Sequence, residues 1–277
     1  MSLAPRSWLF VPADSEKKIA KALESEADAI IFDLEDSVAG SEKARARELL
    51  KSLPERSGGP QWWVRINPLR TDDHRQDLEI IGIADVHGIV LPKAETGADV
   101  VELAHRTGSI PIHAIVTETA ASLFGLLSYQ GAPALAAMSW GAEDLSAALG
   151  AASKYDESGE LGFTYRLARS LCLAGAVAAG VQPVDGVFAD FRDEAGLTAE
   201  ARAAAREGFT GKLAIHPAQV APINAAFTPS REEIAHAQAI VDAFAAQPDA
   251  GVLSVGGRMV DKPHLTQAER LLERASR

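Results

Sequence analysis

The sequence predicts a (β/α)8 barrel, or TIM barrel, with a helical appendage at its C-terminal end. Two observations lead to this fold class. Eight short segments rich in β-branched and apolar residues recur along the chain, and segments of helix-forming composition separate most of them. Several of the eight are continuously apolar, as expected for strands that pack against helices outside and a barrel interior inside. The predicted strands are 7–13, 28–35, 62–67, 88–93, 111–118, 134–141, 184–190 and 212–217.

The segments between the strands distinguish the barrel from its main rival, a doubly wound open sheet. Such a sheet usually has a glycine-rich first turn. Here the first turn reads Val11-Pro12-Ala13-Asp14 and contains no glycine, which favours the barrel. A length of 277 residues also suits a barrel, because this fold often exceeds 200 residues as one domain. Helices are predicted at 15–25, 42–53, 98–107, 119–130, 163–180 and 198–207.

Two further helices are predicted beyond the eighth strand. Ser230-x-x-Glu233 and Thr266-x-x-Glu269 match the capping box, in which side chains at a helix start bond reciprocally to the backbone. The segment 247–257 between them is predicted to be a linker. We therefore expect a barrel over 1–228 and a C-terminal helical extension or lid over 229–277.

Composition and charge exclude several classes of function. A net charge of −11 repels phosphodiester backbones, and no basic stripe with interleaved aromatics is present, so nucleic acid is not an expected partner. The single cysteine, Cys172, lies in an apolar helical run and is expected to be a small buried hydrophobic residue. No stretch reaches the roughly 20 apolar residues that span a bilayer. We expect a cytoplasmic protein without a membrane anchor.

Unusual polar residues gather where the predicted strands end, the face on which barrel enzymes carry their chemistry. Carboxylates from adjacent strand ends would repel one another strongly unless a cation neutralises them. Magnesium prefers one or two protein carboxylates with waters and substrate oxygens, and Glu118 with Asp144 provides that set. The alternative is that each acid only caps the helix after its strand, where the helix dipole favours negative charge. The end-of-strand residues are Glu35, Asp36, Arg65, Asn67, Lys93, Glu118, Glu143, Asp144, Asp190 and His216.

Two basic residues and a histidine complete this set. Arg65 lies inside an apolar strand and must find an anion, either a substrate carboxylate or, in an internal salt bridge, Glu35 or Asp36. Lys93 either neutralises the same acids or contacts substrate. His216 is more often a satisfied histidine at a strand end than a catalytic base.

These residues fall within motifs that resemble the citrate lyase beta subunit and malyl-CoA lyase family, part of the HpcH/HpaI aldolase superfamily. The resemblance extends in order along nearly the whole chain. Its motifs are Arg6-Ser7-x-Leu9-Phe10-Val11-Pro12, Phe32-Asp33-Leu34-Glu35-Asp36, Val64-Arg65-Ile66-Asn67, Leu91-Pro92-Lys93, Glu118-Thr119-Ala120, Gly141-Ala142-Glu143-Asp144-Leu145, Gly211-Lys212-x-Ala214-Ile215-His216-Pro217 and Gly257-Arg258-Met259-Val260-Asp261.

The resemblance implies a role for each site residue. It implies that Glu118 and Asp144 hold Mg2+ and that Glu35 and Asp36 bind its waters. Arg65 would bind the carboxylate of a 2-oxo acid, and the substrate would also meet Lys93, Gly141 and Ala142. Asp261 would be the catalytic acid/base, delivered into a neighbouring subunit's site. The chain departs from the family pattern at Ala13, Thr117 and Gly256, and none of these departures removes a proposed ligand.

The implied activity is that of a magnesium-dependent carbon–carbon lyase. Its substrate would be a 2-hydroxyacyl-CoA such as malyl-CoA, citramalyl-CoA or a citryl thioester. Cleavage gives an acetyl thioester and a 2-oxo acid, and the reverse reaction is a Claisen condensation. The expected partners are these small molecules and further copies of the chain, in a homo-oligomer that is a trimer or a multiple of it.

Three alternatives stay open at this point. One is a CoA-independent class II pyruvate aldolase on the same barrel. Another is a citrate lyase subunit that acts only on an acyl-carrier protein. The last is a barrel that has lost catalysis and serves in binding.

Overall fold

The chain of the computed structural model folds into two compact units, and the structure describes residues 4–54, 58–82 and 84–276. One unit is Ala4–Asn224, and the other begins at Ala225. The boundary expected from the sequence, between 228 and 229, stays a prediction. Among the described residues, no helix has the length and apolar composition needed to cross a membrane.

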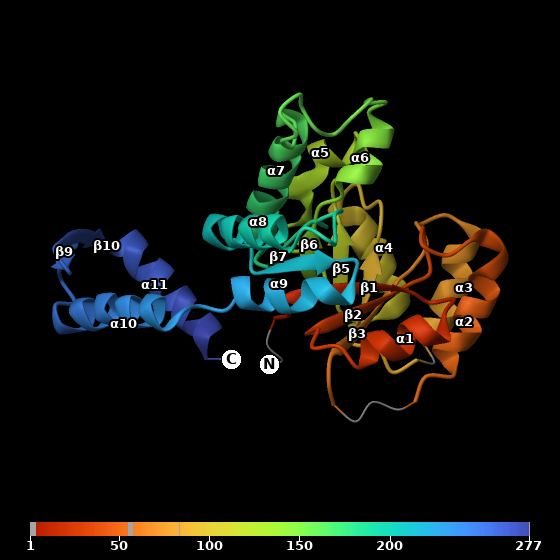
Figure 1. Cartoon of the computed structure of the whole chain (residues 1–277), viewed down its shortest axis with the longest axis horizontal. Coiled ribbons are helices and arrows are strands. Elements are labelled where there is room, and N and C mark those ends of the chain that lie inside the picture. Colours follow the sequence, from red (N-terminus) through yellow and green to blue (C-terminus); the bar gives the residue numbers. More distant parts are fainter. Residues whose placement is uncertain (1–3, 55–57, 83, 277) are drawn as a thin grey trace. The chain divides into compact units, whose positions relative to one another are not determined.

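The first unit is a closed barrel of eight parallel strands, which confirms the predicted fold class (Figure 1). Each strand pairs with the next along the chain, and β1 pairs with β8 to close the ring. All eight strands fall within or beside the predicted segments. They are β1 (Ser7–Pro12), β2 (Ala29–Asp33), β3 (Gln61–Arg65), β4 (Gly88–Leu91), β5 (Ile112–Ile115), β6 (Leu135–Ser139), β7 (Gln182–Asp185) and β8 (Gly211–Ala214).

Several predicted strands extend too far toward their C-terminal ends. The prediction places Asp190 and His216 at the ends of the last two strands, whereas β7 ends at Asp185 and β8 at Ala214. The polar residues that follow leave the sheet because the chain must turn there toward the next helix. Asp190 and His216 therefore lie in loops beyond the strands.

Helices cover the outside of the barrel. Of these, α3, α6 and α9 lie outside the predicted helices. The buried face of α3 includes the polar His74 and Asp77, which hides its apolar periodicity, and α6 and α9 have only 7 residues each. The predicted helix over 119–130 forms only as two short turns, α5 and η2. The helices are α1 (Glu16–Leu23), α2 (Lys43–Lys51), α3 (Asp72–Ile81), α4 (Gly97–Thr107), α5 (Ser122–Gly125), η2 (Leu126–Tyr129), α6 (Ala142–Ala148), α7 (Phe163–Ala179), α8 (Glu194–Glu207) and α9 (Val220–Ala226); η1 (Gly40–Glu42) and η3 (Pro217–Gln219) are short 3-10 turns.

The interior of the barrel is filled by apolar side chains from every strand. Strand residues alternate between the interior and the helices, so the inward residues of all eight strands meet in one cluster. Cys172, as expected, is buried on α7. The cluster consists of Trp8, Ala29, Ile31, Trp63, Val90, Ile115, Ala137, Val184 and Leu213.

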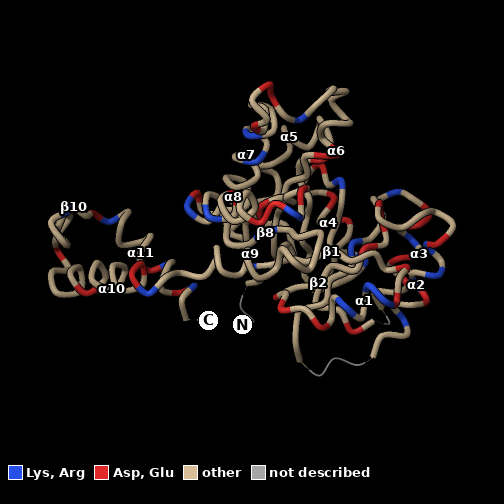
Figure 2. Tube along the Cα trace, viewed as in Figure 1, with Lys and Arg blue, Asp and Glu red and all other residues tan. Residues whose placement is uncertain are grey.

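Charges of both signs occur along the trace of the chain (Figure 2). In the described residues Lys and Arg are interspersed with Asp and Glu along the trace.

The second unit pairs two helices with a β-hairpin. Ser230 and Glu233 form the predicted capping box of α10 (Arg231–Ala246). The other helix, α11 (Lys262–Ala275), begins four residues before the predicted Thr266. The core of this unit consists of Ala237, Ile240, Phe244, Val260 and Ala268.

The predicted linker is partly wrong, because its second half forms strand β9 (Val252–Val255) and the turn into β10 (Arg258–Asp261). Gly256 and Gly257 make the turn with φ of 58° and 78°. Two successive positive φ values suit a two-residue hairpin turn and are disfavoured for residues with a Cβ. Gly256 therefore has a structural reason to be glycine.

A buried histidine in the barrel leads to the first prediction. His113 on β5 is fully buried, lies edge-on to Trp8 at 4.7 Å between ring centroids, and has no hydrogen-bond partner among the described residues for either ring nitrogen. Burial lowers the pKa of His113 to about 3. Because unfolding frees this histidine to take up a proton, its contribution to stability is complete above its unfolded pKa and is lost as the pH falls toward 3.

The expected loss from His113 between pH 7 and pH 5 is about 2 kcal/mol in the free energy of unfolding. His113→Phe should remove this part of the pH dependence. Urea unfolding of both proteins at the two pH values measures it. An equal pH dependence in the variant and the wild type would contradict the prediction.

Candidate active site at the mouth of the barrel

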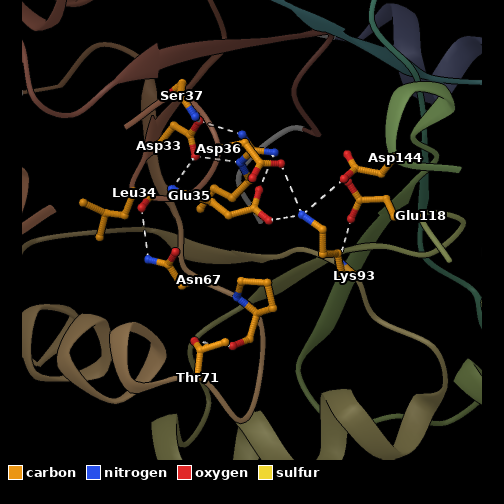
Figure 3. A network of polar contacts seen from close by, with 12 residues as sticks. Asp33, Leu34, Glu35, Asp36, Ser37, Asn67, Thr71, Lys93, Glu118 and Asp144 are labelled. Carbon is orange, nitrogen blue, oxygen red and sulfur yellow. Dashed lines mark hydrogen bonds and ion pairs between the residues drawn. The ribbon is translucent and has the colours of Figure 1, made fainter. Parts of the chain in front are cut away.

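The structure brings the predicted site residues of the barrel together at the carboxyl ends of β2 to β6. Figure 3 shows Lys93 between two groups of acids, with Glu35 and Asp36 on one side and Glu118 and Asp144 on the other. Because all these strands run in the same direction, residues far apart in the sequence meet at one end of the barrel.

Arg65 is held by an acid that the sequence analysis gave no role. Its Nε donates to Asp33 Oδ1 at 2.7 Å, and its Nη2 donates to Asp33 Oδ2 at 2.6 Å. Nη1 forms an ion pair with Glu35 Oε2 at 2.9 Å. Of the two expected alternatives, the internal salt bridge to Glu35 is therefore present. The bidentate partner of the guanidinium is Asp33.

The pairing of Asp33 with Arg65 follows from strand register. The two residues are direct partners on the neighbouring parallel strands β2 and β3, and both side chains are turned into the barrel. An acid and an arginine with this register would have been the signal to search for in the sequence. Burial disfavours both charges, but the hydrogen bonds between them outweigh it, so the pKa of Arg65 is raised and that of Asp33 is lowered. The ring of Phe10 lies 4.8 Å from the guanidinium carbon and covers it.

The loop after β2 is fixed by hydrogen bonds from its surroundings. Asp33 accepts from the backbone N–H of Glu35 at 2.9 Å and of Ser37 at 3.2 Å. From the end of β3, Asn67 Nδ2 donates to the carbonyl of Leu34 at 3.0 Å. These bonds position Glu35 and Asp36 before any substrate binds (Figure 3).

Lys93 contacts acids from three different strand ends. Its Nζ lies 3.2 Å from Asp36 Oδ2 and 3.3 Å from Asp144 Oδ1, and it also bonds to Glu35. Although burial opposes its charge, the bond to Glu35 and the nearby acids raise the pKa of Lys93. Its φ of 51° lies in the left-handed region, which a residue with a Cβ seldom adopts. That backbone directs the N–H of Lys93 to Glu118 Oε2, at 2.5 Å.

Glu118 is nearly fully buried, with 4% of its surface exposed, and its carboxyl group lies beside that of Asp144 (Figure 3). Burial raises its pKa to about 8, and the charges of Asp144 and Glu35 add to the effect. Without a cation, the proton stays on Glu118 at neutral pH. A cation bound here would favour the ionised form of Glu118 and add to the positive charge that Lys93 places beside Asp144.

The donor set fits magnesium. Glu118 and Asp144 place two carboxyl groups side by side at the mouth. Among the described residues, no group of three or more His, Cys, Asp or Glu side chains is arranged to hold a metal ion. Proteins commonly bind magnesium through one or two carboxylates, and waters and substrate oxygens complete its coordination. Acids also outnumber bases here. The acidic side chains are Asp33, Glu35, Asp36, Glu118 and Asp144, and the basic ones are Arg65 and Lys93.

The loop after β6 leaves room for Glu118. A Cβ on Gly141 would lie 2.9 Å from Glu118 Cγ, too close for any other residue without a shift. The N–H of Gly141 donates to Thr117 Oγ1 at 3.2 Å, so Thr117, a departure from the family pattern, supports this loop. Ala142 begins α6, and Asp144 lies in its first turn. Asp144 is thus both a first-turn acid and a neighbour of Glu118, whereas Glu143 pairs with Lys154 away from the site.

A buried ion cluster on β7 and β8 anchors the same loop. Trp140, the residue before Gly141, donates from Nε1 to Asp185 Oδ1 at 2.8 Å. Asp185 also accepts from Lys212 Nζ at 2.9 Å and from Arg169 Nε at 2.8 Å. All the charges in this cluster are paired, so it serves to fix the backbone that leads to Asp144.

His216 is a satisfied histidine, as the sequence analysis favours. Its Nδ1 accepts from the N–H of Ala218 at 3.2 Å, and its ring stacks on Phe191 with 4.6 Å between centroids. It therefore has a structural role in the loop after β8.

Asp261 belongs to the second unit and is described within it. It precedes α11 as its N-cap residue, and its Oδ1 lies 2.5 Å from His264 Nδ1. The hydrogen bond from His264 holds the pKa of Asp261 below its ordinary value. Its assignment as the acid/base stays a prediction.

The fold and site define a class of barrel lyase, and comparison with known proteins agrees. The family described as HpcH/HpaI aldolase/citrate lyase matches residues 6–217. A second family, described as a C-C bond lyase of the TIM-barrel fold, matches residues 165–277. The chain belongs to the HpcH/HpaI aldolase/citrate lyase family, which confirms the resemblance recognised from its motifs.

Individual relatives are similar over nearly their whole length. The chain is 40% identical over 268 residues to a citrate lyase subunit beta-like protein of Mycobacterium tuberculosis, covering 97% of this chain and 94% of that protein. It is 38% identical over 274 residues to a (3S)-malyl-CoA thioesterase of Cereibacter sphaeroides, covering 98% and 94%. The crystal structure of protein CitE from M. tuberculosis in complex with magnesium, acetoacetate and coenzyme A matches with a TM-score of 0.86 and 38% identity, over 99% of both chains.

The raised pKa of Glu118 leads to the second prediction. In the metal-free protein Glu118 holds its proton below about pH 8, and a carboxylate must lose that proton to bind a cation. Binding of Mg2+ at pH 7 should therefore release close to one proton, and the apparent affinity should rise between pH 7 and pH 9. Isothermal titration calorimetry in two buffers of different ionisation enthalpy measures the release. The same titration at pH 9 is the control and should show little dependence on the buffer. Equal heats in both buffers at pH 7 would contradict the prediction.

Proposed function

We propose that this chain is a magnesium-dependent carbon–carbon lyase that cleaves a 2-hydroxyacyl-CoA into an acetyl thioester and a 2-oxo acid, or forms it by Claisen condensation. One observation carries the proposal. Two carboxyl groups, Glu118 and Asp144, lie side by side at the barrel mouth next to a rigidly held arginine, in a member of an aldolase and lyase family. This is the arrangement that a metal-dependent enzyme acting on an anionic oxo acid requires.

Glu118 and Asp144 are the residues that would hold the magnesium. When bound, the ion supplies Lewis-acid stabilisation of the negative charge that develops on the oxygen of the 2-oxo acid. Glu35 and Asp36, facing the pair across Lys93, would accept hydrogen bonds from waters on that ion. The CitE structure with magnesium, acetoacetate and coenzyme A supports this choice of cofactor and ligands.

Arg65 is proposed to bind the carboxylate of the 2-oxo acid. Asp33 occupies Nε and Nη2 and fixes the plane of the guanidinium, so the substrate carboxylate would share or replace the ion pair that Nη1 forms with Glu35. A guanidinium held in this way loses little conformational entropy when it binds an anion. Lys93, Gly141 and Ala142 are proposed to line the same substrate site, since they adjoin Glu118 and Asp144.

Asp261 is proposed as the acid/base. In condensation it would remove a proton from the acetyl methyl group, and in cleavage it would return that proton. A pKa below the ordinary value keeps its carboxylate ionised at neutral pH, the form that accepts a proton. The residue would come from a neighbouring subunit, in a homo-oligomer that is a trimer or a multiple of it. We also propose that the protein acts in the cytoplasm on CoA thioesters.

A second candidate activity has a specific observation in its favour. The relative from C. sphaeroides, 38% identical over nearly the whole chain, is named a thioesterase for (3S)-malyl-CoA. Hydrolysis of the thioester gives malate and free CoA, whereas the lyase reaction on the same substrate gives acetyl-CoA and glyoxylate. The products of one assay therefore separate the two activities.

The two proposed magnesium ligands are tested with Glu118→Gln and Asp144→Asn, which keep the side-chain shape and remove a charge. Each should lower kcat/KM by at least about 1000-fold, because the variant loses a charged ligand that stabilises the transition state. The substrates are malyl-CoA, citramalyl-CoA and citryl-CoA, assayed with and without EDTA and with products identified by chromatography. Glu143→Gln is the matched control, since Glu143 is an acid in the same first turn that pairs with Lys154. Near-normal turnover in EDTA by Glu118→Gln or by Asp144→Asn would contradict the proposal.

The same panel separates the remaining alternatives. A CoA-independent aldolase would cleave a free hydroxy-oxo acid and ignore the thioesters. A citrate lyase subunit would act only on a substrate attached to its acyl-carrier protein. If none of the substrates is turned over, the remaining alternative is a barrel that has lost catalysis and serves in binding.

Sharing of the site between subunits is tested by mixing two inactive proteins, Asp261→Ala and Glu118→Ala. If Asp261 completes a neighbour's site, random exchange in a symmetric oligomer restores both residues in about a quarter of the sites. Lyase activity should then appear from two inactive proteins. Each variant put through exchange with itself is the control. Mixed oligomers, verified by mass spectrometry, that stay inactive would refute a shared site.

A further inference from the structure

An aspartate and a histidine form a pair at the start of α11. Asp261 ends β10 and His264 lies three residues later, in the first turn of the helix. The imidazole Nδ1 lies 2.5 Å from Asp261 Oδ1, a short contact typical of a hydrogen bond to a charged group. Both side chains are partly exposed, with 36% of Asp261 and 45% of His264 accessible. The pair can therefore reach a ligand at the surface of this unit.

We propose that His264 is a positioning residue for Asp261, which orients the carboxylate through the bond from Nδ1 to Oδ1 and so directs the other oxygen to the proton that is transferred. This inference rests on the proposed role of Asp261 as the acid/base. It adds a residue to the reaction that neither the motifs nor the relatives assign. Asp–His pairs in other enzymes divide the work in a related way, one member fixing the orientation of the other.

The alternative is that His264 only caps the start of α11. Asp261 and His264 also satisfy the pattern of a capping box, with the N–H of Asp261 3.3 Å from His264 Nδ1. One ring nitrogen cannot both accept from that N–H and donate to Oδ1. The contact to Oδ1 is shorter by 0.8 Å, from 2.5 and 3.3 Å, so the proton of Nδ1 belongs in the bond to the carboxylate. The weaker contact is then secondary, and capping is not the main role of the histidine.

Among the described residues, His264 is the main electrostatic neighbour of Asp261. Asp261 pairs across the hairpin with Val252, which carries no charge. Lys262, the next residue, turns its Nζ over the ring of Phe244 on α10, 4.9 Å from the centroid. On the same helix, Asp242 accepts from Gln238. On the side of β10, Arg258 pairs with Val255 at the hairpin turn.

The bond has a consequence for the pH dependence of the reaction. His264 holds the pKa of Asp261 below its ordinary value, chiefly through this hydrogen bond. In condensation the carboxylate must be ionised to accept a proton, so the rate falls as the pH falls through the pKa of Asp261. Without the bond that pKa rises, and the acidic limb of the rate profile should move to higher pH.

Two substitutions separate positioning from capping. His264→Glu keeps an N3 residue that favours the capping box but removes the donor. His264→Asn keeps a side-chain N–H close to the position of Nδ1. Condensation kinetics across pH give kcat and KM, and the loss of the acetyl-CoA methyl signal in D2O, followed by proton NMR without a 2-oxo acid, reports proton removal alone. Asp261→Asn is the reference for loss of the acid/base.

We expect His264→Glu to lower kcat at least about tenfold, the loss that follows removal of one hydrogen bond to a charged group, with KM little changed. Its acidic limb should move upward and its methyl exchange should slow, while His264→Asn stays close to wild type and both variants unfold at the wild-type temperature. If His264→Glu matches the wild type in kcat, pH profile and exchange, the histidine only caps the helix and the inference fails. If Asp261→Asn itself stays active, the proposed role of Asp261 fails instead.

Discussion

The mouth of the barrel depends on two basic side chains that hold several carboxylates together. Parallel strands bring acids from separate parts of the chain to one end of the fold, where burial increases their mutual repulsion. Arg65 neutralises Asp33 and Glu35, and Lys93 contacts Glu35, Asp36 and Asp144. The nearly buried Glu118 is left with a raised pKa and with room for a further positive charge. The affinity for a cation that we propose for this site would thus follow from how its charges are paired.

This pairing requires local backbone geometry that most residues would not adopt. Lys93 has a positive φ that directs its N–H to Glu118, and Gly141 lacks the Cβ that would collide with that side chain. Behind Gly141, the bond from Trp140 to the buried Asp185 fixes the loop that carries Asp144. Such constraints position the carboxylates before a ligand arrives, which reduces the reorganisation that the reaction needs.

The residues proposed for binding and for proton transfer lie on two different compact units. The barrel carries the acids, the arginine and the lysine, while the proposed acid/base Asp261 lies on a small unit of two helices and a hairpin. Within that unit, the bond to His264 would provide the orientation that the barrel residues receive from their buried surroundings.

The sequence by itself determined the fold class, the set of acids at the strand ends and the family. Eight apolar strands separated by helices favour a closed barrel, and polar residues that follow parallel strands must meet at one end of that barrel. The sequence analysis missed α3, whose buried face is partly polar, and the short helices α6 and α9, and it read strand β9 and the turn after it as part of a linker.

Only the tertiary structure decided which charges pair. Asp33 is the partner of Arg65 because β2 and β3 align these two residues, and the positive φ of Lys93 directs its backbone N–H to Glu118. Sequence patterns report the period of each segment, whereas the register between strands and the direction of a side chain arise from packing across the whole barrel.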